Sequence, residues 1–150
     1  MGDLYTIGFT KKTAEQFYNL IRNNGITTII DVRLNNTSQL ASFSKYPDIV
    51  FFLHEICNCK YISERFFSPE EKTLKDYKNN AITWEEYVIQ FNETLERRCI
   101  KDFISRNYSK IVQNEKICFL CSEDLPNMCH RKIIADIFAE LFDMKVNHLK

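Results

Sequence analysis

The segment KICFLCSEDLPNMCHRKIIADIFAELF at residues 116–142 joins two hydrophobic patterns of different period. Residues 116–121 form a short, almost wholly apolar run, which is typical of a strand buried in a parallel sheet. After the loop, apolar side chains recur at helical spacing, and these are Ile133, Ile134, Ile137, Phe138, Leu141 and Phe142. A buried strand followed by an amphipathic helix predicts an α/β fold, with a loop between them that is rich in reactive side chains.

The rest of the chain repeats this alternation. Further strands are predicted at residues 4–9, 27–33, 60–63 and 144–149. Helix starts are indicated by the capping boxes Thr13 with Gln16 and Ser68 with Glu71, and also at Pro47, Thr83 and Ile100. The pattern predicts an open, mostly parallel sheet with helices on both faces. Residues 68–112 are predicted to be a helical insertion that covers the rim of the site.

Length and composition fit one domain spanning residues 1–150. The 20 basic residues balance the 20 acidic ones, so no overall charge indicates nucleic acid or a membrane as partner. The N-terminal residues lack the apolar run of a signal peptide, and no apolar stretch is long enough for a membrane span. Six cysteines without such a signal predict a cytoplasmic protein whose thiols are buried, catalytic or metal-bound. The oligomeric state is not indicated.

Side chains with chemical potential follow the predicted strands. Parallel sheets place their sites outside the carboxyl ends of their strands. Two such ends carry Asp31 with Arg33, and Cys121 with Glu123. The helix after the second of them begins near Cys129, His130 and Arg131. We therefore expect these side chains to form one site.

The predicted helix start has specific chemistry. If Asn127 caps this helix, Cys129 and His130 lie in its first turn, where backbone N–H groups and the helix dipole favour anions and lower a thiol's pKa. His130 can transfer protons near neutral pH, and Arg131 offers a planar fork for phosphate or carboxylate.

Two expectations follow for neighbouring side chains. Either Cys121 or Cys129 is expected to be a partly exposed, reactive thiol, while Cys118 is expected to belong to the core. The guanidinium groups of Arg33 and Arg131 are expected to line one cleft, with Asp31 nearby.

The cysteine spacing resembles a zinc pattern only by count. Cys118 and Cys121 have opposite parity on the predicted strand, so their side chains point to opposite faces of the sheet. The sequence thus predicts no metal site, and it indicates no cofactor.

The chain resembles the domain-of-unknown-function 488 family (DUF488) in several ordered motifs. These are TIGFT, TIIDVRLNNTSQL, SFSKYPDIVFFLHEI, the SPEEKTLKDYKNNAITWEEY block, LCSEDLPNMCHR and VNHL, and they extend from residue 4 to residue 149. The resemblance implies an α/β fold and no established reaction. It also implies functional positions at Gly8, Asp31, Arg33, Ser38, Tyr61, Cys121, Glu123, Cys129, His130 and Arg131, together with His148.

One departure from the family is clear. Many relatives carry a Leu-Gly-Gly segment after the tyrosine, whereas Tyr61 is followed here by ISERFFSPEEK. A second, weaker likeness is to rhodanese-like and cysteine-phosphatase domains, in which a nucleophilic cysteine and an arginine cradle an oxyanion. Here nine residues separate Cys121 from Arg131, which is too many for the tight phosphatase loop.

Three hypotheses follow. The first is an enzyme for an anionic, nucleotide-like substrate. In it, Cys121 or Cys129 is the nucleophile, His130 and Glu123 carry protons, and Arg33 and Arg131 hold the anion. The second is a non-catalytic module that binds a nucleotide or nucleic acid in the same pocket. The third is a structural polar network without a ligand.

Overall fold

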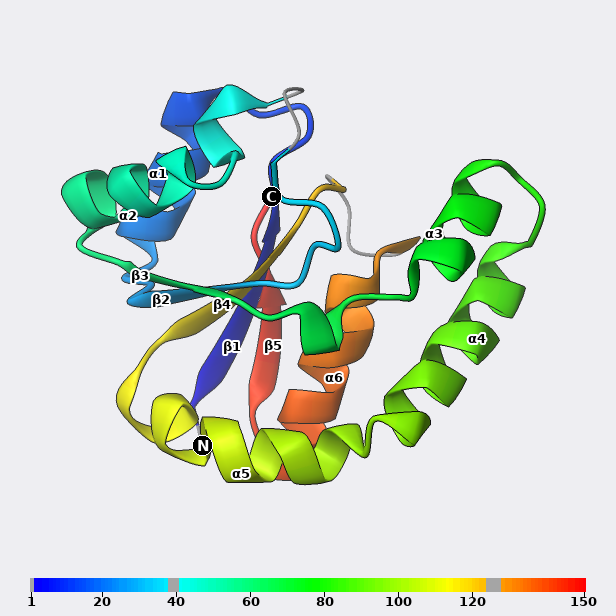
Figure 1. Cartoon of the computed structure of the whole chain (residues 1–150). Coiled ribbons are helices and arrows are strands. Elements are labelled where there is room, and N and C mark those ends of the chain that lie inside the picture. The colour runs from blue at the N-terminus through cyan, green and yellow to red at the C-terminus, as the bar shows by residue number, and fades with distance from the viewer. Residues whose placement is uncertain (1, 38–40, 124–127) are drawn as a thin grey trace.

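The computed structural model describes residues 2–37, 41–123 and 128–150. Within these residues, the five strands form a single parallel sheet in the order β3-β2-β4-β1-β5 (Figure 1). The strands are β1 (Asp3–Gly8), β2 (Thr28–Asp31), β3 (Lys60–Ser63), β4 (Ile117–Cys121) and β5 (Lys145–His148). The predicted α/β fold with a parallel sheet is therefore confirmed.

Helices cover both faces of this sheet. The first face carries α1 (Ala14–Asn23) and α2 (Asp48–Cys57), whose apolar side chains pack with Ile29, Cys118 and Leu120. The second face carries α5 (Ile100–Asn114) and α6 (His130–Phe142), which pack with Ile30, Phe119 and Cys121. Strand β4 thus alternates between the two cores, as the period of two in a strand requires. None of the helices in the described residues has the length and apolar character needed to cross a membrane.

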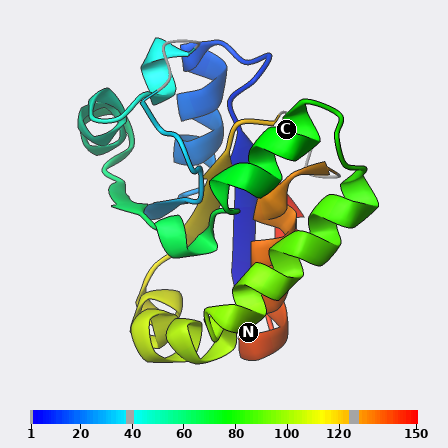
Figure 2. The same ribbon diagram turned by 45° about the vertical axis from the view of Figure 1, so that its right-hand side comes forward.

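The segment predicted as a helical insertion has two parts. Helices α3 (Glu71–Lys78) and α4 (Trp84–Arg97) form a hairpin that lies in front of α6 in Figure 2. Helix α5, which follows the hairpin along the chain, instead packs in the second core against α6. Two 3-10 turns, η1 (Ser42–Ser44) and η2 (Arg65–Phe67), complete the described elements.

The capping signals were correct at two helix starts and wrong at a third. Thr13 and Thr83 each form the complete capping box with Gln16 and Glu86, respectively. Ser68 does not cap α3, because its hydroxyl donates to the carbonyl of Arg65 at 2.6 Å and so closes the turn η2. Helix α3 begins later, after Glu70.

The start of α6 also differs from the prediction. Cys129 has extended backbone angles and is the N-cap, so the first helical residue is His130. The predicted cap, Asn127, lies outside the described residues. Cys129 therefore does not lie in the first turn, where the dipole argument had placed it.

The strand order creates a crevice at the carboxyl end of β4. This strand lies between β1 and β2, whose chains continue into α1 and α2 on the first face. The chain leaving β4 continues into α6 on the second face. Because the connections diverge to opposite faces, the carboxyl ends of these three strands border an open space, which is where parallel sheets bind ligands.

Candidate functional site

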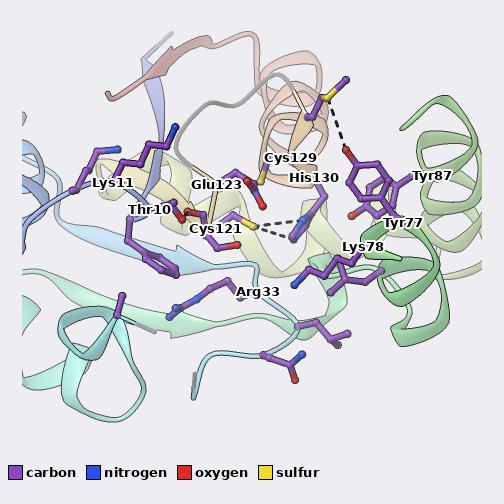
Figure 3. Close-up of a pocket in the computed structure, with 18 of the residues that line it drawn as sticks. Thr10, Lys11, Arg33, Tyr77, Lys78, Tyr87, Cys121, Glu123, Cys129 and His130 are labelled. Carbon is purple, nitrogen blue, oxygen red and sulfur yellow. Dashed lines mark hydrogen bonds between the residues drawn. The ribbon is translucent and has the colours of Figure 1, made fainter. Parts of the chain in front are cut away.

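A cavity of about 710 Å³ occupies this crevice (Figure 3). Its sheet side consists of the segments that follow β1, β2 and β4, including Thr10, Arg33 and Cys121. Its opposite wall comes from the hairpin, through Tyr77 on α3 and Tyr87 on α4. The hairpin therefore lines the cavity, whereas α5, the last part of the predicted insertion, packs in the second core instead.

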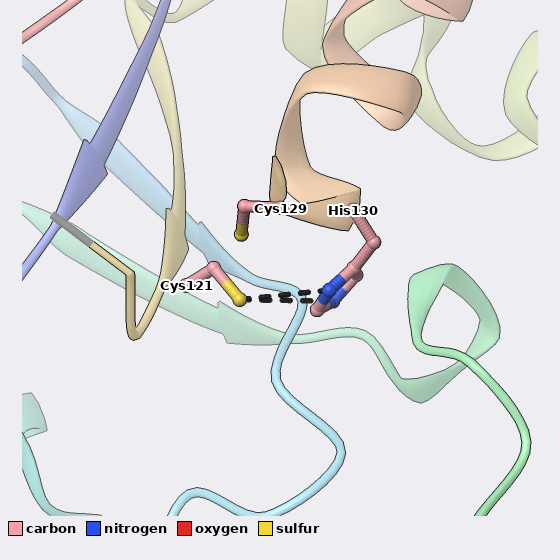
Figure 4. A group of neighbouring side chains, drawn as sticks. All are labelled: Cys121, Cys129 and His130. Carbon is pink, nitrogen blue, oxygen red and sulfur yellow. Dashed lines mark hydrogen bonds between the residues drawn. The ribbon is translucent and has the colours of Figure 1, made fainter. Parts of the chain in front are cut away.

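Three side chains form what we call the thiol cluster, namely Cys121, Cys129 and His130 (Figure 4). The sulfur of Cys121 lies 3.6 Å from Nδ1 of His130. The other ring nitrogen, Nε2, lies 2.7 Å from the carbonyl oxygen of Val32. Because a carbonyl only accepts hydrogen bonds, Nε2 carries the proton and Nδ1 is the unprotonated nitrogen. The Cys121 sulfur also lies 3.8 Å from Nε2, so it contacts the ring at both nitrogens.

Packing holds the imidazole in this position. The ring of Phe91 from α4 meets the ring of His130 edge-on, with centroids 5.7 Å apart. His130 is buried, and it is also the first residue of α6, so its backbone is held by that helix. The orientation of the ring thus depends on β2, α4 and α6 together.

The two thiols of the cluster differ in acidity. A hydrogen bond from the Cys129 thiol lowers the pKa of Cys121 against the opposing effect of burial, and the Ser122 backbone N–H and the charge of Arg131 act in the same direction. The pKa of Cys129 is raised, because its thiol donates to Cys121 and because it is buried. The helix-dipole argument, which favoured Cys129 as the more acidic thiol, is therefore wrong.

Neither thiol is partly exposed, which corrects a second expectation. Cys121 and Cys129 are 4% and 3% exposed, respectively, yet both line the cavity. Cys118 is fully buried in the opposite core, and burial raises its pKa well above that of an ordinary thiol. The cavity that all three residues of the thiol cluster line offers a reagent a route to it.

The thiol cluster also has the composition of a metal site. Its three ligand atoms all lie within 4.8 Å of one another. The parity argument correctly placed Cys118 on the other face of the sheet, but it excludes that residue alone. Cys121, Cys129 and His130 form the cluster without Cys118, so the position of Cys118 does not argue against a metal here.

A second polar group, which we call the Asp31 cluster, lies at the end of β2 and consists of Asp31, Arg33, Asn36 and Tyr61. The guanidinium of Arg33 donates through Nε and an Nη to the two oxygens of Asp31, at 2.9 and 2.8 Å. It also donates to the carbonyl of Ser44 at 2.7 Å. Tyr61 donates its hydroxyl to Asp31 at 2.5 Å, and Asn36 donates to the Tyr61 oxygen at 3.1 Å. Asp31 thus serves to hold Arg33 and Tyr61 in place.

The expectation that Arg33 and Arg131 line one cleft is wrong. Arg33 lines the cavity, but Arg131 is fully buried and does not. From the second position of α6, its side chain donates to the carbonyl of Glu123, which follows β4. Arg131 therefore holds the backbone of Glu123 from inside, and its positive charge lowers the pKa of Cys121.

The remaining predicted positions separate into lining and supporting residues. Glu123 is exposed and lines the cavity together with the thiol cluster. Gly8 does not line the cavity. Glycine is required there for packing, because a Cβ would lie 1.5 Å from the carbonyl oxygen of Glu123. His148 pairs with the Thr6 hydroxyl at 2.5 Å and also lies away from the cavity. Ser38 lies outside the described residues.

Several lining residues were missed from the sequence. Lys11 and Lys12 follow β1 at the same sheet edge as Arg33, and that position alone was a usable signal. Lys78 reaches the cavity from the end of α3, which no local pattern indicates. These basic side chains and Arg33 face a single acidic lining residue among those described, Glu123.

The hairpin contributes an aromatic wall. Trp84 and Tyr87 stack with centroids 5.0 Å apart and an interplanar angle of 16°. Tyr77 packs against both rings. Trp84 and Tyr87 both pack in the second core, and both also line the cavity.

Comparison with known proteins identifies the family. The model of the family described as "Domain of unknown function DUF488" matches residues 13–138. The chain belongs to the DUF488 family. No curated protein and no solved structure matches the chain. In this member of the family, the thiol cluster and the basic rim of the cavity are the features that call for a functional explanation.

Proposed function

We propose that this DUF488 protein is an enzyme that acts on an anionic, nucleotide-like substrate, with Cys121 as its nucleophile. The observation that carries the proposal is the position of the Cys121 sulfur. It lies in a cavity with a basic rim, 3.6 Å from an imidazole nitrogen whose ring orientation is fixed by the Val32 carbonyl. A thiol paired with an oriented base is the arrangement that nucleophilic catalysis requires.

The walls of the cavity suit the two halves of a nucleotide. Lys11, Lys12 and Lys78 offer positive charge for a phosphate group. Trp84, which is partly exposed and stacks on the buried ring of Tyr87, offers aromatic surface against which a planar base can pack. The chain has no overall charge excess, so the attraction for anions is local to this cavity.

The cluster supports a two-step reaction. In the first step, the Cys121 thiol proton passes to Nδ1 of His130 while the sulfur attacks the electrophilic atom of the substrate. The bond to the leaving group breaks, and the leaving group takes the proton from His130. In the second step, water attacks the same atom and releases the thiolate, and Glu123 accepts the water proton. Each step thus has a nucleophile, a leaving group and a proton acceptor drawn from residues that line the cavity.

The second candidate is a binding module without catalysis. It is favoured by the aromatic wall and basic rim, which need no thiol to hold a nucleotide. In this case Cys121 would be a buried side chain of the cavity floor. The two candidates differ in what happens when Cys121 is replaced.

The experiment uses Trp84, which is the single tryptophan of the chain. Its fluorescence is followed while nucleoside monophosphates, free nucleosides or inorganic phosphate are added to metal-free protein. The proposal predicts tighter binding of a nucleoside monophosphate than of either half. The same compounds and their phosphate esters are then screened for turnover, and a reaction that Cys121→Ser abolishes while binding persists supports the enzyme. Binding without any Cys121-dependent turnover supports the module, and no binding contradicts both.

A further inference from the structure

We propose that Cys121, Cys129 and His130 form a three-ligand site for a thiophilic divalent cation, with Zn²⁺ as the best match, and that the bound cation withdraws Cys121 from thiol chemistry. The ligand set is two sulfurs and one imidazole nitrogen, which is the combination that soft and borderline metals prefer. The inference does not depend on the proposed reaction, because it needs only these three side chains and a route to them.

The distances agree with a tetrahedral zinc centre. Zinc–sulfur bonds of about 2.3 Å and zinc–nitrogen bonds of about 2.0 Å place neighbouring ligand atoms roughly 3.5–3.8 Å apart. The Cys121 sulfur and Nδ1 of His130 are already 3.6 Å apart. All three ligand atoms lie within 4.8 Å of one another, so side-chain adjustments of about 1 Å complete the geometry.

The outer contacts of the imidazole match those of a metal ligand. A metal-bound histidine ordinarily donates its other ring N–H to a carbonyl or carboxylate, which fixes the nitrogen that faces the metal. Here Nε2 donates to the Val32 carbonyl at 2.7 Å, so Nδ1 is the nitrogen left unprotonated and available as a ligand, 3.6 Å from the Cys121 sulfur. The protein thus holds the histidine in the tautomer that the site requires.

The fourth position would open into the cavity. All three ligand residues line it, so a cation can enter from the cavity side, and water or an anion can complete the coordination there. A sulfur that is bound to the metal has its lone pair engaged and is no longer available to attack a substrate or an alkylating reagent. Metal binding and Cys121 alkylation should therefore exclude each other.

The test is a Co²⁺ titration of chelator-treated, full-length protein. The expected result is one equivalent bound, with intense visible bands typical of tetrahedral Co²⁺ and a near-ultraviolet thiolate-to-cobalt band, all removed by Zn²⁺. Cys121→Ser, Cys129→Ser and His130→Gln should each weaken binding at least tenfold. The matched control is Cys99→Ser, which removes an exposed thiol at the N-cap of α5 and should not change metal binding. Circular dichroism of each variant shows whether it is folded.

Two results would overturn the site. One is the absence of the thiolate-to-cobalt band in the wild type. The other is a band that survives intact in folded Cys129→Ser or His130→Gln protein. Because nucleotide binding is measured at Trp84 in metal-free protein, failure of the metal site and failure of the proposed function are separate outcomes. Alkylation of Cys121 gives an independent readout, and one equivalent of Zn²⁺ should slow it at least tenfold.

Discussion

The Asp31 cluster and the thiol cluster lie at the carboxyl ends of the neighbouring strands β2 and β4, yet their polar groups are used differently. In the Asp31 cluster, the carboxylate receives hydrogen bonds from Arg33 and Tyr61 and is fully buried. In the thiol cluster, the Cys121 sulfur lies 3.6 Å from the unprotonated Nδ1 of His130, and both residues line the cavity. The position at a strand end therefore does not by itself distinguish a scaffold from a site. What distinguishes a scaffold from a site is whether its polar groups are hydrogen-bonded to one another or remain available to a ligand in the cavity.

The largest expected effect is on stability, and it tests whether the Asp31 cluster is a scaffold. Asp31→Asn leaves the buried guanidinium of Arg33 without its ion pair, which typically costs about 3–5 kcal/mol of unfolding free energy. Cys121→Ser, in contrast, should cost only about 1 kcal/mol. Urea unfolding followed by circular dichroism measures both. Similar losses in the two variants would show that the clusters do not differ in this way.

A smaller effect concerns the hydroxyl of Tyr61. Tyr61→Phe removes its hydrogen bond to a buried carboxylate and should lower the unfolding free energy by about 1.5 kcal/mol. Burial and the charge of Asp31 raise the pKa of Tyr61, so its neutral form is favoured in the folded protein. This contribution is complete below the ordinary tyrosine pKa of about 10 and is lost as the pH rises above it.

The difference between wild type and Tyr61→Phe should therefore narrow above about pH 10. Unfolding curves of both proteins at several alkaline pH values provide the measurement. A difference that is independent of pH would mean that the phenol is not held neutral by this cluster.

The sequence predicted side-chain positions correctly where they follow from the period of a strand or from the carboxyl end of a strand. Parity along β4 correctly separated Cys118 from Cys121, and the strand-end rule brought Cys121, Glu123 and His130 to one cavity. The strand-end rule failed for Arg131, which does not line the cavity. The direction of a side chain at a helix start depends on which residue is the first helical one, and that residue was not predicted correctly.

Other features were not accessible from local pattern at all. The Val32 carbonyl that orients His130 is a backbone group, and no side chain marks it. Lys78 reaches the cavity only because the α3–α4 hairpin packs over α6, which is a tertiary contact. Gly8 was counted among the ligand-binding residues, although it is required by the close approach of the Glu123 carbonyl.

The smallest expected effect is on ligand affinity, and it tests the basic rim of the cavity. Lys78→Ala should weaken binding of a nucleoside monophosphate by about 0.5–1 kcal/mol, or two- to fivefold, because one exposed positive charge is lost from the rim. The matched control is Lys72→Ala on the same helix, where the lysine pairs with Asp76 and does not line the cavity. Fluorescence titration at low and high salt should show a difference that shrinks with salt. Equal effects of the two variants would remove Lys78 from the site.

The central claim is that Cys121 is a reachable thiol in a positively charged cavity, and competitive alkylation tests it most directly. Metal-free protein is treated in parallel with anionic iodoacetate and neutral iodoacetamide, and the modified cysteines are mapped by mass spectrometry. Exposed Cys99 is the internal reference, because it is outside the cavity. We predict that the ratio of iodoacetate to iodoacetamide rates is on the order of fivefold higher at Cys121 than at Cys99, and that salt reduces the difference. Equal ratios at the two cysteines, or no modification of Cys121 in the folded protein, would contradict the claim.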